Sequence, residues 1–212
     1  YVQPDKGDTI IQRAAFTFFK SEMFCFDPKF RYVAAAEAPN ILKNVSTYTL
    51  QVFDLDNGKE QISQIAHQQP VSALSFNNEG RFLATASRDG FLKLWDIAQK
   101  REALSMVTDG HKDYIALTPE NYYQASKGAH GLLAFEQQGR LMAFEQFDLR
   151  FNRPDLVLQK MGIASDTVVK AYYHAFQKRL GKMGFTEAML GQDFDLPELA
   201  ILDKDIPLST VA

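Results

Sequence analysis

Short apolar runs separated by turn residues dominate the middle of the chain. Val71–Phe76, Phe82–Ala86 and Phe91–Trp95 are rich in the residue types that favour strands. The two links between them, Asn77–Gly80 and Arg88–Gly90, contain residues that tolerate positive φ. The pattern therefore predicts an antiparallel meander, and a further apolar run predicts its fourth strand at Glu102–Val107.

Related patterns occur on both sides of this meander. Val52–Asp54 precedes Trp95–Asp96, and Ala134–Glu136 follows it, with a period of about 40 residues that is typical of propeller blades. A second pattern recurs upstream of each of these three segments. It is found at Phe26–Ala34, at Phe76–Ala84 and, in a shortened form, at Thr118–Ala125. We therefore predict three repeat units, at Ile10–Ile65, Ala66–Val107 and Thr108–Phe147.

The polar residues of the middle unit resemble those of the WD40 repeat family. They are His67 before the first strand, Ser87 at the end of the second, Asp89 in the turn and Trp95 in the third. Buried polar groups need hydrogen-bond partners, and an indole, a hydroxyl, an imidazole and a carboxylate can satisfy one another. We interpret these four residues as a structural polar set, and not as a catalytic histidine–aspartate pair.

The outer units depart from this pattern. The first has an insertion at Ala38–Ser46, and the third lacks both the tryptophan and the turn aspartate. Closed propellers typically use four to eight blades, so three units are too few for a ring. We expect the end of a propeller whose earlier blades lie upstream. An open stack covered by the C-terminal segment, or blades supplied by another chain, remain alternatives.

The C-terminal part has a helical pattern. Pro154 suits a first helical turn and Gly162 a helix end, which predicts a short helix between them. Apolar residues at helical spacing predict a longer helix over Asp166–Met183, with Ser165 as its cap. The predicted fold is thus mainly β: WD40-type blades of a partial propeller over residues 1–147, then a small α-helical linker over residues 148–212.

Composition narrows the range of functions. The chain has 212 residues, 46% of them hydrophobic, and a formal net charge of −3. Lys and Arg are dispersed, so we expect no nucleic-acid partner, and no apolar run is long enough to predict a membrane segment. The expected partner is a protein or a neighbouring domain. Association into homo-oligomers through open blade edges is a further possibility.

Candidate reactive residues are few. The lone Cys25 lies in an apolar strand pattern, which favours a small packed side chain over a nucleophile. His111, Asp113 and His130 invite a metal interpretation, but no metal-ligand spacing supports it. We therefore predict no catalytic residues, no metal and no cofactor.

A second resemblance concerns the junction between the two parts. Tyr114–Ser126, Phe144–Asp148 and Asn152–Asp155 look like the junction in large bacterial WD40 proteins that carry a caspase-like peptidase domain downstream. The resemblance implies that these residues couple the last blade to a following domain. Within them, Asn152, Arg153 and Asp155 are a candidate interdomain latch, the alternative being a local ion-pair network that fixes the linker.

Three functional hypotheses follow. The main one is a non-enzymatic WD40 scaffold segment for protein–protein or interdomain interaction. The second is a segment that positions or restrains a caspase-like peptidase domain of a longer parent protein, with the peptidase chemistry outside this chain. The third, a propeller hydrolase or lectin, lacks any cluster of paired carboxylates in the sequence.

Overall fold

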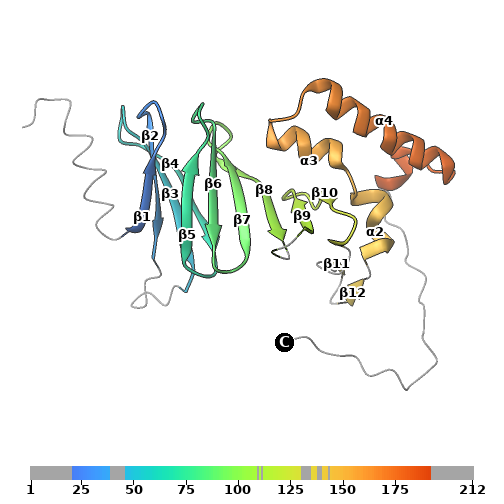
Figure 1. Cartoon of the computed structure of the whole chain (residues 1–212), viewed down its shortest axis with the longest axis horizontal. Coiled ribbons are helices and arrows are strands. Elements are labelled where there is room, and N and C mark those ends of the chain that lie inside the picture. Colours follow the sequence, from blue (N-terminus) through green and yellow to red (C-terminus); the bar gives the residue numbers. More distant parts are fainter. Residues whose placement is uncertain are drawn as a thin grey trace, which may run out of the picture.

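The structure is a computed structural model that describes residues 21–38, 46–108, 110, 112–129, 135–137, 140–142 and 144–191. Strands occupy the first part of this range and helices follow them (Figure 1). This order confirms the prediction of a mainly β chain with a small helical segment behind the blades.

The first sheet is a four-stranded antiparallel meander. Its strands, in spatial order, are β1 (Ser21–Phe26), β2 (Tyr32–Glu37), β3 (Tyr48–Asp54) and β4 (Glu60–His67). The predicted insertion at Ala38–Ser46 falls between β2 and β3, and its residues 39–45 lie outside the described residues.

The second sheet contains the middle repeat unit and extends beyond it. Its spatial order is β10-β9-β8-β7-β6-β5. The four strands predicted for the middle unit are confirmed, as β5 (Val71–Phe76), β6 (Phe82–Ser87), β7 (Phe91–Asp96) and β8 (Arg101–Thr108).

The same turn recurs in all three units. The backbone N–H of Asp27 donates to the carbonyl of Tyr32, that of Asn77 to Phe82, and that of Thr118 to Tyr122. Each turn contains one residue in the left-handed region, and these are Phe30 at φ 55°, Gly80 at 69° and Asn121 at 67°. The pattern that links the three units in the sequence therefore corresponds to a repeated local structure.

The third unit nevertheless differs from the expected separate blade. Its first two strands, β9 (Tyr114–Leu117) and β10 (Tyr123–Ala125), join the second sheet through β8. A separate hairpin, β11 (Phe135–Gln137) with β12 (Arg140–Met142), follows. The third unit therefore adds its first two strands to the edge of β8 and does not form a sheet of its own.

The main core lies between the first and second sheets, which stand side by side in Figure 1. The first sheet contributes mainly small and branched side chains, and the second contributes larger ones. The buried members are Ala34, Leu50, Val52, Ile62 and Ala66 from the first sheet and its end, and Leu83, Trp95 and Ile97 from the second. Removal of this apolar surface from water is the main force that holds the sheets together.

Helices cover the other end of the second sheet. They are α2 (Phe144–Phe151), α3 (Pro154–Met161), α4 (Asp166–Lys182) and the 3-10 helix η3 (Glu187–Gly191). Gly162 ends α3 in the left-handed conformation, as predicted, and lies against the ring of Phe82. Among the described helices, none is both long and apolar enough to cross a membrane.

Two details of the helical prediction are corrected. Ser165 occupies the N-cap position of α4, but its side chain makes no capping hydrogen bond. The sequence also did not predict α2, which includes residues 147 and 148, and the domain division between these residues stays a prediction. The aromatic residues of Phe144–Phe151 resemble a strand pattern as much as a helical one, which explains the omission.

Close packing at Gly80 generates a stability prediction. A Cβ at Gly80 would overlap the guanidinium of Arg31 and the carboxylate of Asp27 in the neighbouring sheet, and the residue has positive φ. Gly90 also has positive φ, but a Cβ there would contact nothing within 4 Å. We expect Gly90→Ala to cost about 1 kcal/mol for the backbone alone and Gly80→Ala about 3 kcal/mol. Urea denaturation measures both, and equal costs would contradict the packing argument.

Candidate functional site

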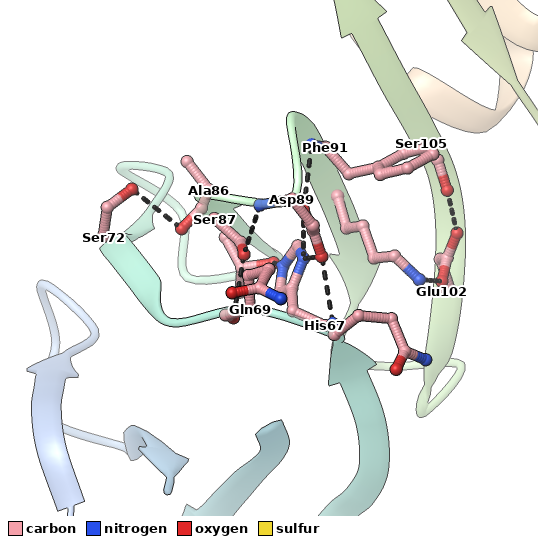
Figure 2. Close-up of polar contacts among 12 residues, drawn as sticks. His67, Gln69, Ser72, Ala86, Ser87, Asp89, Phe91, Glu102 and Ser105 are labelled. Carbon is pink, nitrogen blue, oxygen red and sulfur yellow. Dashed lines mark hydrogen bonds and ion pairs between the residues drawn. The ribbon is translucent and has the colours of Figure 1, made fainter. Parts of the chain in front are cut away.

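A chain of buried hydrogen bonds joins the first sheet to the second. His67, the last residue of β4, has a fully buried side chain. Its Nδ1 lies 3.0 Å from Oδ2 of Asp89, and its Nε2 lies 2.7 Å from Oγ1 of Thr85. The indole N–H of Trp95 donates to the same hydroxyl at 3.1 Å. Figure 2 shows the contact between His67 and Asp89.

The chemistry of these partners fixes the protons. An ionised carboxylate only accepts, so Nδ1 of His67 carries a proton and donates to Asp89. Nε2 then accepts from the hydroxyl of Thr85, which in turn accepts from the indole of Trp95. Each of the polar side chains in this hydrogen-bond network thus has a partner, as buried polar groups require.

The turn at Asp89 is held separately. Its carboxylate accepts from the backbone N–H groups of Gln68 and Phe91, at 3.1 and 3.0 Å. Ser87 donates its hydroxyl to the carbonyl of Gln69 at 2.9 Å and accepts from the N–H of Asp89 (Figure 2). Ser87 therefore fixes the loop around the network and does not bridge the imidazole and the indole.

Thr85 is the residue that sequence reasoning missed. The structure brings together three of the four predicted members, His67, Asp89 and Trp95, and places Thr85 at their centre. Thr85 and Ser87 lie on the same face of β6, because strand residues alternate between faces. The strand period does not distinguish the two hydroxyls, and the packed position of Trp95, which the sequence does not give, selects Thr85.

The order of hydroxyl, imidazole and carboxylate resembles that of a hydrolase triad, but the geometry is unsuited to catalysis. Thr85 is 1% exposed, and both ring nitrogens of His67 are occupied. A nucleophile needs access to substrate and a base that takes its proton in turn. Here the hydroxyl has no route to a substrate, so the arrangement favours rigidity over reaction.

Burial also shapes the titration of the network. Burial of the imidazole lowers the pKa of His67, and this effect outweighs the opposing effect of the Asp89 carboxylate. Burial would raise the pKa of Asp89, but hydrogen bonds from the N–H groups of Phe91 and Gln68, with the nearby His67, lower it overall. The network therefore favours a neutral imidazole beside an ionised carboxylate.

A second cluster, which we call the Arg153 junction, connects the second sheet to the helices. The N–H of Arg153 donates to the carbonyl of Tyr123 in β10 at 3.0 Å. Its guanidinium donates three hydrogen bonds to Asp155, at 2.9, 3.3 and 2.8 Å, and one to Glu187 of η3 at 3.1 Å. The same group lies 4.0 Å from the ring centre of Phe176 in α4.

The guanidinium of Arg153 is enclosed and stays charged. The residue is only 8% exposed and also lies near the rings of Tyr122 and Tyr173. Burial alone would lower its pKa, but the carboxylates of Asp155 and Glu187 raise it above the ordinary value. A planar, permanently charged group suits this combination of bidentate ion pair and aromatic contact.

The backbone and side chain of Asn152 belong to an adjacent group of contacts. Its side-chain amide donates to Asp148 at 2.7 Å, and its carbonyl accepts from Arg179 of α4 at 2.8 Å. The hydroxyl of Tyr123 donates to the same Asp148 oxygen at 2.8 Å. Asn152 also forms a parallel bridge with Tyr123, so the linker occupies the open edge of β10.

The predicted latch residues are therefore close together, with partners that the sequence did not indicate. Asp148, Phe176, Arg179 and Glu187 come from α2, α4 and η3 and have no distinctive motif. Of the three candidate metal ligands, His111 and His130 lie outside the described residues. Asp113 accepts from the hydroxyl of Ser126 and the N–H of Gly128. Within the described part of the chain, no three His, Cys, Asp or Glu residues could hold a metal ion.

Cys25 lies at the seam between the sheets. It is half-buried against the main core, and burial raises the pKa of its thiol to about 11, with a smaller opposing effect of the Phe76 backbone. A thiol with this pKa is a poor nucleophile at neutral pH, because the thiolate is the reactive form.

Comparison with known proteins identifies the class. Residues 58–96 match the family model "WD domain, G-beta repeat". This segment contains the whole of β4 through β7 and every residue of the buried network. The fold is thus mainly β, of the WD40 β-propeller type, with a WD40 repeat in the middle of the chain.

Several fungal proteins are similar to parts of the chain. A coronin-like protein of Saccharomyces cerevisiae is 34% identical over 65 residues, 30% of this chain and 10% of that protein. The target of rapamycin complex subunit wat1 of Schizosaccharomyces pombe is 26% identical over 123 residues, 57% of this chain and 34% of that protein. The small ribosomal subunit protein RACK1 of Neurospora crassa is 20% identical, over 50% of this chain and 34% of that protein.

The similarity covers only part of each known protein. The matched segments span between 10% and 34% of the lengths of these three relatives. Among solved structures, the β-propeller domain of Cps50 (Swd1) of Myceliophteria thermophila aligns with a TM-score of 0.36 at 17% identity, over 50% of this chain and 33% of that chain. These relatives are eukaryotic, and they give no support to the expected bacterial parent.

The shared hydroxyl of Thr85 generates a mutational prediction. Thr85→Val keeps the shape of the side chain but leaves the indole N–H of Trp95 and Nε2 of His67 without their partner. We expect a loss of about 2–3 kcal/mol in the free energy of unfolding. Thr85→Ser restores the hydroxyl and is the matched control, with a smaller loss. Fluorescence of Trp95, the single tryptophan, follows unfolding in urea, and equal losses for Val and Ser would contradict the network.

The lowered pKa of His67 predicts a pH dependence. The unfolded chain takes up a proton on this histidine near pH 6.5, whereas the folded chain does so only at lower pH. The stability that the neutral imidazole contributes is complete above this pH and is lost as the pH falls below it. We expect His67→Gln to flatten the decline in unfolding free energy between about pH 7 and 5, and exposed His174→Gln to leave it unchanged. An unchanged decline in His67→Gln would disprove this assignment.

Proposed function

We propose that this chain is a non-enzymatic scaffold segment that mediates protein–protein or interdomain interaction. In this proposal the buried network of His67 and Trp95 is structural and gives the blades a fixed shape. The observation that carries the proposal is the Arg153 junction, because one residue connects the second sheet to three helical elements: its backbone N–H binds β10, and its guanidinium contacts α3, α4 and η3.

The relatives support the general class. Two of their names place WD40-type proteins in assemblies, one in a target of rapamycin complex and one in the small ribosomal subunit. WD40 propeller proteins act as scaffolds for protein interaction, and this is the role we propose for the chain. Which partner it takes, and whether its open sheet edges pair with another copy, stay predictions.

The second candidate function is control of a neighbouring domain. It is favoured by the position of α3 and α4, which Arg153 and Arg179 connect to the last strands of the second sheet. In this second hypothesis Asn152, Arg153 and Asp155 act as an interdomain latch that couples the position of the blades to that of a domain following α4. A caspase-like peptidase as that domain rests on the sequence resemblance alone.

The latch hypothesis predicts a loss of coupling in Arg153→Ala. Trp95 fluorescence reports the sheets and the circular dichroism of the helices reports α3 and α4, so coincident thermal transitions indicate one cooperative unit. We expect the two transitions to coincide in the wild type and to separate in Arg153→Ala, with the helices unfolding first. Faster proteolytic cleavage within residues 148–165 should accompany the separation.

Arg88→Ala is the matched control, because Arg88 is exposed in the turn between β6 and β7. It removes the same charge and should leave both transitions and the cleavage rate unchanged. If Arg153→Ala behaves like Arg88→Ala, the junction is not a latch and the proposed coupling fails.

A further inference from the structure

One face of α4 packs inside the molecule. Phe176 and Leu180 are buried there with Leu190, and Tyr173 lies beside them. In Figure 1, α3 lies between α4 and the last strands of the second sheet, so α4 is on the outer side of the helices. This packing accounts for one stripe of the helix and leaves most of its other residues exposed.

A second stripe is exposed along nearly the whole of α4. Its residues are four, three, three and four positions apart, which places them on one side of the helix. All five side chains are exposed, and we call them the α4 stripe: Val168, Tyr172, Ala175, Lys178 and Lys182. Val168 and Tyr172 are each 42% exposed, so two large side chains with apolar surface face solvent here.

The α4 stripe is apolar in its first half and basic in its second. Lys178 and Lys182 make no ion pair within the described part of the chain, whereas the neighbouring Arg179 binds Asp148 and the carbonyl of Asn152. Lysines near the end of a helix stabilise it through the helix dipole, but this role does not account for the exposed apolar residues of the same stripe.

This pattern fits an acidic amphipathic helix. Spacings of three and four residues match the side-chain rows of a second helix, which packs along such a stripe with its own apolar residues. Ala175 in the middle is small and allows the two helices to approach closely. Carboxylates opposite Lys178 and Lys182 balance their charge and select an acidic partner over a basic one.

A membrane surface suits the α4 stripe less well. Helices that lie in a membrane insert a wide apolar face into the lipid. The most apolar face of α4 is already buried in the molecule through Phe176 and Leu180. The exposed stripe offers only a narrow apolar row, which matches the width of one helix.

We propose that the α4 stripe binds an amphipathic helix of a partner protein, one that carries apolar residues at one end and Asp or Glu at the other. The apolar residues of the partner lie on Val168, Tyr172 and Ala175, and its carboxylates lie beside Lys178 and Lys182. The inference rests on the proposed scaffold role and specifies the chemical nature of the partner. It uses a different face of α4 from Phe176, which contacts Arg153.

Fluorescence anisotropy with a designed peptide tests the proposal on the complete 212-residue chain. The probe is a fluorescein-labelled helical peptide of about 18 residues, with leucines in one half of a single stripe and glutamates in the other half. A peptide of the same composition in scrambled order, which has no stripe, is the control probe. We expect saturable binding of the first peptide and no binding of the second at the same concentrations.

Two variants assign the binding to the α4 stripe. Tyr172→Ser removes exposed apolar surface, and Lys178→Glu combined with Lys182→Glu reverses the charge. We expect each to weaken binding about tenfold. A peptide with lysine in place of each glutamate should restore binding to the charge-reversed variant, an effect that a mere loss of helix stability does not produce.

Matched controls change the same kinds of residue away from α4. Ile65→Ser removes an exposed apolar side chain of β4, and Lys59→Glu combined with Lys127→Glu reverses two exposed lysines. Both should bind the glutamate peptide as the wild type does. A weakening as large as that of the α4 variants would overturn the proposal.

Several other results would also contradict the α4 stripe as a docking site. They are no binding of the glutamate peptide, equal binding of the scrambled peptide, unchanged binding by Tyr172→Ser, and no rescue by the lysine peptide. Binding to vesicles of phosphatidylcholine and phosphatidylserine that is lost in Tyr172→Ser would assign the stripe to a membrane instead. The Arg153→Ala variant tests the scaffold role separately, so failure of peptide binding alone leaves that role standing.

Discussion

The rest of the structure depends on the hydrogen bonds that the imidazole of His67 makes between the two sheets. His67 is at the end of β4 in the first sheet, and both hydrogen-bond partners of its ring lie in the second sheet. Burial of the imidazole without those partners would destabilise the folded state. All hydrogen bonds of the imidazole are therefore made in only one relative position of the two sheets. Apolar burial between Val52, Leu83 and Trp95 supplies most of the attraction, and the polar chain selects the geometry.

The third unit differs in architecture from the first two. Between the first two units, β4 ends in His67 and a short link with Pro70 leads to a new sheet. Between the second and third units, β8 pairs directly with β9, and the third unit adds its hairpin to an existing sheet. The open edge of β10 then accepts Asn152, which brings Arg153 into position among the helices. The irregular third unit is thus what makes the Arg153 junction possible.

Local sequence patterns predicted most of the strands and helices. They did not predict contacts between residues that are distant in the sequence. Alternation and turn residues located the four strands of the middle unit, and Pro154 with Gly162 located α3. Thr85 was overlooked because its hydroxyl and that of Ser87 share a strand face, and only the packed position of Trp95 separates them. The partners of Arg153 in α4 and η3 depend on how the helices fold back, which no motif near residue 153 encodes. Pairing of β9 with β8 escaped prediction because sequence similarity between repeats suggested a separate blade.

The shared sheet also bears on how such a chain can evolve. Repeat proteins grow and shrink by duplication and deletion of whole units, which requires joints that can be cut without exposing hydrogen-bonding edges. The link between β4 and β5 is such a joint, because each side keeps its own hydrogen-bonded sheet, of four strands before the link and six after it. A breakpoint between β8 and β9 would instead divide one hydrogen-bonded sheet. Exchange of the first sheet therefore keeps the backbone hydrogen bonds of both sheets but needs a histidine at the position of His67, whereas the second unit, the hairpin and the helices are inherited as a single block.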